Sequence, residues 1–197
     1  MRIAACLLLA LTCPPVAAHD MKQHSQDAAG TRIVASAGAP VEQLVLPDIP
    51  VTDKEGATAG FVGRLAQVGP VLIGFSYTGC VSLCPITHAI LADVDQGMRG
   101  SKTPPLTIVT LSIDPANDTP ERLAATAREL DASPRWQWLV ASPADTPALL
   151  SALGVASGPI ESHDPVFLLG DMASGEFRRI VGLPDPRELL RLAGAMH

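Results

Sequence analysis

Phe75-Ser-Tyr-Thr-Gly-Cys80-Val-Ser-Leu-Cys84-Pro85 joins two segments of predicted regular structure. Residues 71–75 form a continuous apolar run, which predicts a strand buried on both faces. Residues 85–98 carry apolar side chains at close to helical spacing, and Pro85 suits the first turn of a helix, where its missing N–H costs nothing. The two cysteines are therefore predicted to lie at a strand-to-helix junction.

The rest of the chain continues to alternate between strand and helix patterns. We expect an irregular hairpin over 44–61, strands over 106–113, 136–140, 165–169 and 176–181, and helices over 121–130, 143–153 and 186–195. Thr119 is the expected N-cap of the second helix, and Gly154 the end of the third. This order predicts an α/β layer, and a cysteine pair at a strand-to-helix junction is typical of the thioredoxin-like fold, a central mixed sheet flanked by helices.

Composition excludes some classes of protein. The 197 residues are 47% hydrophobic and 17% charged, which fits a globular domain and argues against overall disorder. The net charge is −6, no basic patch is visible, and aromatic residues make up only 4% of the chain. Nucleic acid is therefore not an expected partner.

The N-terminus has the pattern of a secretory signal. Arg2 precedes a short apolar run, and small residues around Ala18 offer a cleavage site. We expect a signal peptide over 1–18, a flexible leader over 19–43 and the thioredoxin-like domain over 44–197, exported to a bacterial periplasm. A lipid anchor at Cys13 is the alternative, and the protein would associate with a membrane only if this N-terminus were retained.

Loss of the signal would leave a single pair of cysteines, Cys80 and Cys84. An exported protein with one close pair has either a disulfide or a metal site. The leader adds His19, Met21 and His24, which would bind copper weakly or form part of a solvated tail.

The predicted position of the cysteines decides what they can do. A helix N-terminus favours thiolate, which is both the nucleophile of disulfide exchange and a metal ligand. Two thiolates select Cu(I) or Zn(II) over harder ions. An inert structural disulfide is the alternative, although such a small loop would stabilise the fold little.

A metal site needs a further ligand, and two histidines are candidates. His88 lies one helical turn beyond Cys84, and we expect it on the surface. His163 lies just before the strand expected over 165–169, on a loop that packs against the cysteine turn in thioredoxin-like folds. His163 therefore has a geometric reason to be a ligand.

Three motifs together resemble the Sco/SenC family, the assembly factors of cytochrome c oxidase. They are Cys80-x-x-x-Cys84-Pro85 after Phe75-Ser-Tyr-Thr, Ser112-Ile-Asp114-Pro115 with Asp118-Thr119-Pro120-Glu121, and His163 followed by Leu168-Leu169 and Asp171. The resemblance implies a copper site made by Cys80, Cys84 and His163, with Cu(I) held by the two thiolates and Cu(II) also by the histidine. Asp114 would support this site or cap its own loop.

The resemblance also implies a partner and an activity. The protein would deliver copper to the copper-site subunit of cytochrome c oxidase or another exported copper protein, or reduce its thiols, with a thiol reductant as a further partner. The segment Ser162-His163-Asp164-Pro165 departs from the family, because Pro165 falls where thioredoxin-like oxidoreductases carry a cis-proline.

This departure supports an alternative function, a periplasmic thiol–disulfide oxidoreductase in which Cys80 attacks and Cys84 resolves. A peroxidase acting through Cys80 and a non-redox interaction domain are two further alternatives.

Overall fold

The central strand of the sheet is β4, Pro70–Ser76, which follows directly from the apolar run in the sequence. The computed structural model describes residues 39–81, 83–99, 106–155 and 165–196. Within these residues, β4 pairs with β5 in parallel and with β7 in antiparallel orientation. The side chains of Leu72 and Ile73 are fully buried on opposite faces of the sheet, so the prediction of a doubly buried strand is confirmed.

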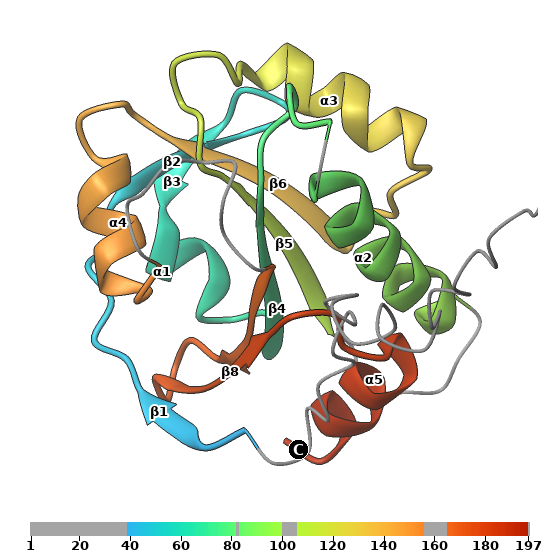
Figure 1. Cartoon of the computed structure of the whole chain (residues 1–197). Helices are drawn as coiled ribbons and strands as arrows, with labels where there is room; N and C mark the ends of the chain where they lie inside the picture. The colour runs from blue at the N-terminus through green and yellow to red at the C-terminus, as the bar shows by residue number, and fades with distance from the viewer. Residues whose placement is uncertain (1–38, 82, 100–105, 156–164, 197) are drawn as a thin grey trace, which may run out of the picture. The chain divides into compact units, whose positions relative to one another are not determined.

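Eight strands and five helices make up the described part of the chain (Figure 1). The strands are β1 Val41–Gln43, β2 Pro50–Asp53, β3 Thr58–Gly60, β4 Pro70–Ser76, β5 Thr107–Ser112, β6 Trp136–Ala141, β7 Val166–Asp171 and β8 Glu176–Val181. The helices are α1 Phe61–Leu65, α2 Cys84–Met98, α3 Pro120–Glu129, α4 Thr146–Ala152 and α5 Pro186–Gly194.

The strands form one mixed sheet in the order β1-β8-β7-β4-β5-β6-β2-β3. Strands β4, β5 and β6 run parallel to one another, and every other pair is antiparallel. Ser76, the last residue of β4, is the register partner of Ser112, the last residue of β5. The loops that leave these two strands therefore start side by side, and one of them carries the cysteines.

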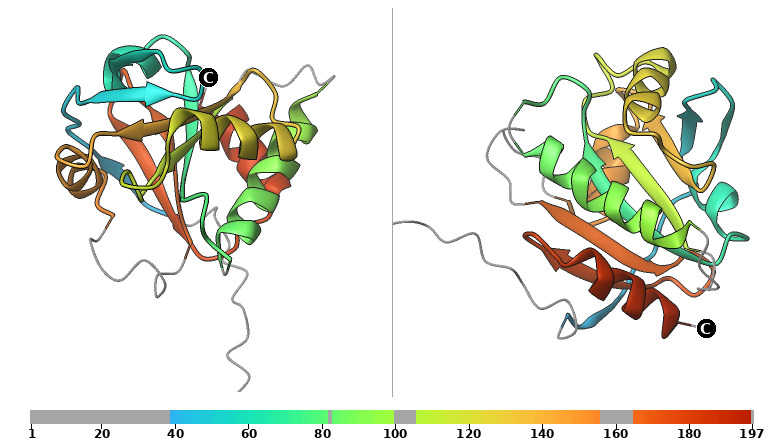
Figure 2. Two further views of the ribbon diagram at one scale, coloured as in Figure 1. Left: turned by 90° about the horizontal axis from the view of Figure 1, so that it is seen from above. Right: turned by 90° about the vertical axis from the view of Figure 1, so that its right-hand side faces the viewer.

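Helices cover both faces of the sheet. On one face, α2, α3 and α5 pack over Leu72, Ile108 and Trp136. On the other, α1 and α4 pack over Ile73 and Val109. Figure 2 shows α2 and α5 side by side on their face, in agreement with their direct contact. The predicted thioredoxin-like arrangement of a mixed sheet between helices is confirmed.

Local signals set several helix boundaries as predicted. The amide of Arg122 donates to the Thr119 hydroxyl at 3.4 Å, which makes Thr119 the N-cap of α3. Gly154 follows α4 with a φ of +65°, a conformation that favours glycine. Helix α4 begins later than predicted, at Thr146, because Ser142 and Asp145 form a hydrogen-bonded turn before it.

Two short elements were not predicted. Helix α1 starts at Phe61, the last residue of the segment that was expected to be an irregular hairpin, and continues to Leu65. Strand β1 pairs with β8, so strand pairing within the described residues begins at Val41 rather than at Leu44. Residues 41–43, which were assigned to a flexible leader, are therefore the edge strand of the sheet.

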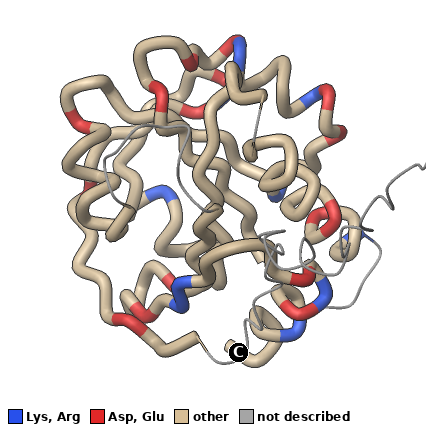
Figure 3. The backbone as a smooth tube through the Cα atoms, viewed as in Figure 1, with Lys and Arg blue, Asp and Glu red and all other residues tan. Residues whose placement is uncertain are grey.

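Charged residues of both signs are intermixed in the described chain (Figure 3). Arg191 pairs with Glu188 on α5, and Arg179 on β8 pairs with Glu42 on β1. No helix in the described ranges combines the length and the apolar character that a bilayer-spanning segment needs.

The spacing between β4 and α2 depends on Gly74. A Cβ atom at this position would lie 2.9 Å from Cδ1 of Leu91 and 3.5 Å from Cγ2 of Thr87. Leu91 is fully buried, so its methyl group has little room to move. The absence of a side chain at Gly74 thus lets the helix that starts at Cys84 lie close to the sheet.

Gly74→Ala should therefore lower the free energy of unfolding by about 1–3 kcal/mol through overpacking. Urea denaturation measures the change. The control is Gly194→Ala in α5, where a new Cβ meets nothing within 4 Å. That variant should be unchanged or more stable by about 0.5–1 kcal/mol. Equal stability of the two variants would contradict the close approach of α2 to β4.

Candidate functional site

The two cysteines lie together at the end of β4. The chain leaves the strand at Ser76, turns, and enters α2 at Cys84, with Pro85 in the first turn of the helix. Cys80 and Cys84 are joined by a disulfide, with their Cα atoms 5.7 Å apart. Cys84 is only 8% exposed, whereas Cys80 is half-buried in the turn. The predicted meeting of the two sulfurs at a strand-to-helix junction is therefore present.

The N-terminus of α2 acts on one sulfur in particular. The backbone N–H of Cys84 donates to Sγ of Cys80 at 3.3 Å. A helix N-terminus carries a partial positive charge, and an N–H donor favours the anionic form of a sulfur. After reduction, Cys80 is therefore the sulfur that this end of the helix stabilises as thiolate, and its partial exposure leaves it accessible to a partner molecule.

A buried carboxylate ties the cysteine turn to the neighbouring strand. Asp118 is 3% exposed and accepts hydrogen bonds from the backbone N–H of Thr78 at 3.1 Å and from its hydroxyl at 2.6 Å. It also accepts from the hydroxyl of Ser112, at the end of β5, at 2.6 Å. Asp118 thus holds the turn before Cys80 against the loop that follows β5.

Sequence reasoning had singled out Asp114 in this loop and not Asp118. The carboxylate of Asp114 instead accepts from the side-chain amide of Asn117 at 2.9 and 3.0 Å, and its carbonyl accepts from the backbone of Asn117 and Asp118. Asp114 therefore caps its own loop. Both aspartates belong to the same motif, and nothing in their spacing distinguishes the one that reaches the turn.

His88 is buried below the cysteine turn, so its predicted surface position was wrong. It is 8% exposed, and Nε2 lies 2.7 Å from the hydroxyl of Ser76. Its ring packs against Trp138, with 5.3 Å between the ring centroids. Burial lowers the pKa of His88 to about 4, although the charge of Asp118 opposes this shift. His88 is therefore neutral at neutral pH and joins α2 to the end of β4.

The predicted third ligand, His163, lies outside the described residues, as do His19, Met21 and His24. The described residues contain no cluster of three or more His, Cys, Asp or Glu side chains suited to a metal ion. Pro165 is described, and its carbonyl accepts from the N–H of Gly182 at 2.7 Å. Its peptide bond begins at Asp164, outside the described part. The three-residue copper site therefore stays a prediction.

Two chemical states are open to the cysteine pair. As a disulfide, the pair exchanges with an attacking thiolate. After reduction, it presents two sulfur ligands, which suit a soft ion such as Cu(I). The two states exclude each other, because sulfurs that are bonded together do not provide two thiolates.

Asp118→Ala should lower the free energy of unfolding by about 2–4 kcal/mol, because three donors around a buried site lose their acceptor. Urea denaturation of the oxidised protein measures this loss. Asp93→Ala removes an exposed carboxylate from α2 and serves as the control, with an expected change within about 0.5 kcal/mol. A loss no larger than that of the control would show that Asp118 does not anchor the turn.

Acid should destabilise the protein partly through His88. Its pKa is about 4 in the folded state and 6.5 without burial, so between these values the unfolded chain binds a proton that the folded protein excludes. The contribution of neutral His88 to the free energy of unfolding is complete above pH 6.5. It is lost, by up to about 3 kcal/mol, as the pH falls to about 4. The free energy of unfolding, measured with urea over this pH range, should depend less on pH in His88→Gln than in the wild type. Identical pH dependences would contradict the burial of a neutral His88.

Solved structures share this fold. A SCO1/SenC family lipoprotein from Bacillus anthracis matches with a TM-score of 0.69 and 20% identity, over 79% of this chain and 96% of that one. Arabidopsis thaliana ScoI with copper bound matches at 0.67 and 17%, over 77% and 97%. BsSco, described as a member of the Sco family of cytochrome c oxidase assembly proteins with a disulfide switch, matches at 0.66 and 17%, over 81% and 98%.

Sequence comparison gives the family. No curated protein sequence matches the chain. The SCO1/SenC family model matches residues 54–162, a range that includes both cysteines and Asp118 and ends just before His163. This match spans more than half of the sequence and contains the strand, turn and helix that form the cysteine site, so the chain belongs to the SCO1/SenC family.

Proposed function

We propose that the protein binds copper through Cys80 and Cys84 in their reduced state, with His163 as a third ligand. The observation that carries this proposal is the cysteine pair itself, held at the N-terminus of α2 with Cys80 half-buried and Cys84 buried. Two thiolates at such a position suit Cu(I), and an imidazole would strengthen the binding of Cu(I) and complete a site for Cu(II). The copper-bound Arabidopsis ScoI supports this assignment.

Copper is the cargo in this proposal, and cytochrome c oxidase is its destination. The protein would deliver copper to the copper site of the oxidase, or reduce the thiols there so that they accept it. BsSco belongs to the Sco family of cytochrome c oxidase assembly proteins, which supports a partner connected with the oxidase. Another exported copper protein would meet the same chemical requirement.

The disulfide gates this activity. Two reductant thiols reduce the Cys80–Cys84 bond, forming two protein thiols and one reductant disulfide. Binding of Cu(I) then releases the protons of the ligating thiols, because thiolate is the metal ligand. Copper affinity would therefore depend on the redox state of the pair.

We also propose that this chemistry takes place outside the cytoplasm. Residues 1–18 have the pattern of a signal peptide, residues 19–40 would form a leader, and the folded domain follows. Retention of the N-terminus would attach the protein to a membrane, and the Bacillus anthracis relative is described as a lipoprotein.

A thiol–disulfide oxidoreductase is the second candidate. The observation that favours it is the difference between the two sulfurs: Cys80 is half-buried and accepts an N–H bond, while Cys84 is buried. This difference fits an attacking Cys80 and a resolving Cys84. Steady turnover of a small disulfide substrate that survives His163→Ala would support this function.

Competition with a chromophoric Cu(I) chelator tests the copper proposal on the fully reduced protein. One-to-one binding should be lost in Cys80→Ala and Cys84→Ala, and weakened about ten-fold or more in His163→Ala, because each variant removes one ligand. His197→Ala changes a histidine that has no role in the proposal, so it is the matched control and should bind as the wild type does. Failure of the reduced wild-type protein to compete for Cu(I) would overturn the proposal and leave disulfide exchange.

A further inference from the structure

Exposed apolar side chains lie next to the cysteine pair. In the described ranges, five large hydrophobic side chains are exposed, and two of them, Val81 and Ile86, lie within two residues of a cysteine of the pair. Val81 is 94% exposed and Ile86 is 40% exposed. Single exposed side chains of this kind are normal on a protein surface. Two of them beside one reactive sulfur indicate a surface on which another molecule docks.

The start of α2 extends this apolar surface. Pro85 and Ala89 are exposed like Ile86, and the three are neighbours because residues three and four apart lie side by side on a helix. The disulfide holds Cys80 against the same end of the helix. Together these residues form one apolar patch around the half-buried sulfur. The apolar patch consists of Val81, Pro85, Ile86 and Ala89.

The segment that carries the apolar patch has no charged side chain. Residues 65–92 contain no Lys, Arg, Asp or Glu. His88 lies within this segment, but it is buried rather than exposed on the patch. The next charged residue along the helix is Asp93, nine residues after Cys84 and roughly 13 Å further along the helix axis. This surface therefore offers apolar contact and does not select a partner by charge.

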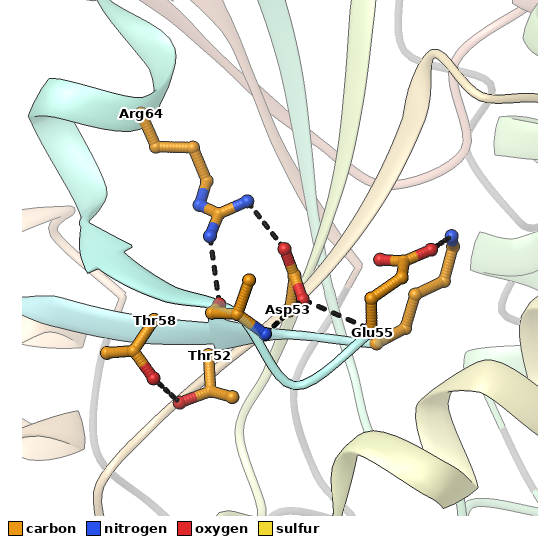
Figure 4. Close-up of polar contacts among 7 residues, drawn as sticks. Thr52, Asp53, Glu55, Thr58 and Arg64 are labelled. Carbon is orange, nitrogen blue, oxygen red and sulfur yellow. Dashed lines mark hydrogen bonds and ion pairs between the residues drawn. The ribbon is translucent and has the colours of Figure 1, made fainter.

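Charged residues outside this segment are engaged within the protein. Arg64, which precedes the segment, donates to Asp53 at 2.8 Å and to the carbonyl of Ala57 at 2.9 Å, so it is directed to the β2–β3 hairpin (Figure 4). In the loop after β5, Asp118 is buried by its three donors, and Asp114 caps its own loop. These interactions keep the charges of both regions away from the exposed face of the patch.

A partner that reaches the sulfur of Cys80 must also touch the apolar patch. Cys84 is buried, so a partner molecule approaches the pair from the side of Cys80. Neighbouring Cα atoms of a chain are about 3.8 Å apart, so the residues on either side of a partner's cysteine come close to Val81 and Ile86. Apolar side chains there would bury surface favourably, whereas polar ones would lose water without gaining a hydrogen bond.

We propose that the apolar patch binds an extended segment of a partner protein in which apolar residues flank the cysteine that exchanges with Cys80. This docking role rests on the thiol exchange named in the proposed function. The thiolate of Cys80 attacks the disulfide of the partner, forms a mixed disulfide and releases one partner thiolate. The thiolate of Cys84 then attacks the sulfur of Cys80, which re-forms the Cys80–Cys84 bond and releases the second partner thiol.

Two short peptides test this preference on the fully reduced protein after removal of the reductant. Each contains one cysteine joined by a disulfide to thionitrobenzoate, and the cysteine is flanked by leucine in one peptide and by glutamine in the other. Release of thionitrobenzoate is followed by absorbance, and the background from other thiols, measured with Cys80→Ser, is subtracted. Rates with 2-mercaptoethanol correct for the intrinsic reactivity of each peptide.

The wild-type protein should react about ten-fold faster with the leucine peptide than with the glutamine peptide, after this correction. Such a factor corresponds to burial of about one aliphatic side chain in the encounter. The ratio of the two rates is the informative quantity, because a change in the reactivity of Cys80 affects both rates and cancels.

A pair of variants locates the preference. The double variant Val81→Asn, Ile86→Gln makes the patch polar without adding charge, and its rate ratio should fall to near one. Val45→Asn is the matched control, because Val45 is 89% exposed and its neighbour Leu44 bonds to Gly175, in the turn at the far end of β7 and β8. Its ratio should equal that of the wild type.

Equal corrected rates for the two peptides with the wild-type protein would overturn the docking role and leave thiol exchange intact. A ratio of about ten that persists in the double variant would overturn it as well. No release above the Cys80→Ser background with either peptide would overturn the docking role together with the thiol exchange on which it rests. Copper binding is measured separately by chelator competition, so these failures are distinguishable.

Discussion

The carboxylate of Asp118 is the constraint on which the cysteine site depends. It accepts hydrogen bonds from the turn that leaves β4 and from the end of β5, and it is almost completely buried. This arrangement is available because β4 and β5 run parallel and end at the same level, with Ser76 opposite Ser112. A buried carboxylate is costly unless its oxygens are satisfied, so the turn and the strand must stay together for the charge to be accommodated. The position of Cys80 follows from this requirement.

A second polar contact fixes the helical side of the site. His88 extends from α2 to the hydroxyl of Ser76, and its ring is enclosed by the layer that contains Trp138. The first turn of α2 is thereby connected to the same end of β4 from which the cysteine turn leaves. Asp118 holds the turn and His88 holds the helix, so the two sulfurs are positioned by separate contacts. The proposed copper chemistry needs both sulfurs in reach of one ion, and these contacts provide the frame for it.

Elements with a local cause were predictable from the sequence, and those that depend on distant contacts were not. The apolar run of β4 and the Thr119-Pro120 start of α3 have signals within a few residues, and both are present. Strand β1 is three residues long and is stabilised by pairing with β8, which no local pattern reveals. The burial of His88 depends on how α2 packs on the sheet, so a histidine one turn after Cys84 looked like a surface residue. His163 was identified through its motif, and its place at the site remains a prediction.

The close approach of α2 to β4 at Gly74 divides the site into a part that is fixed and a part that can adapt. Cys84 belongs to helix α2, whose distance from the sheet is set by the packing of its Leu91 side chain against Gly74 of β4, so Cys84 has little freedom to change position. Any change in the distance between the sulfurs, on reduction or on loading with an ion, must then be absorbed by the turn that carries Cys80. Val81, in this turn, is 94% exposed. The redox or metal-bound state of the cysteine pair would thus change the shape of the exposed turn, and another protein can recognise that shape.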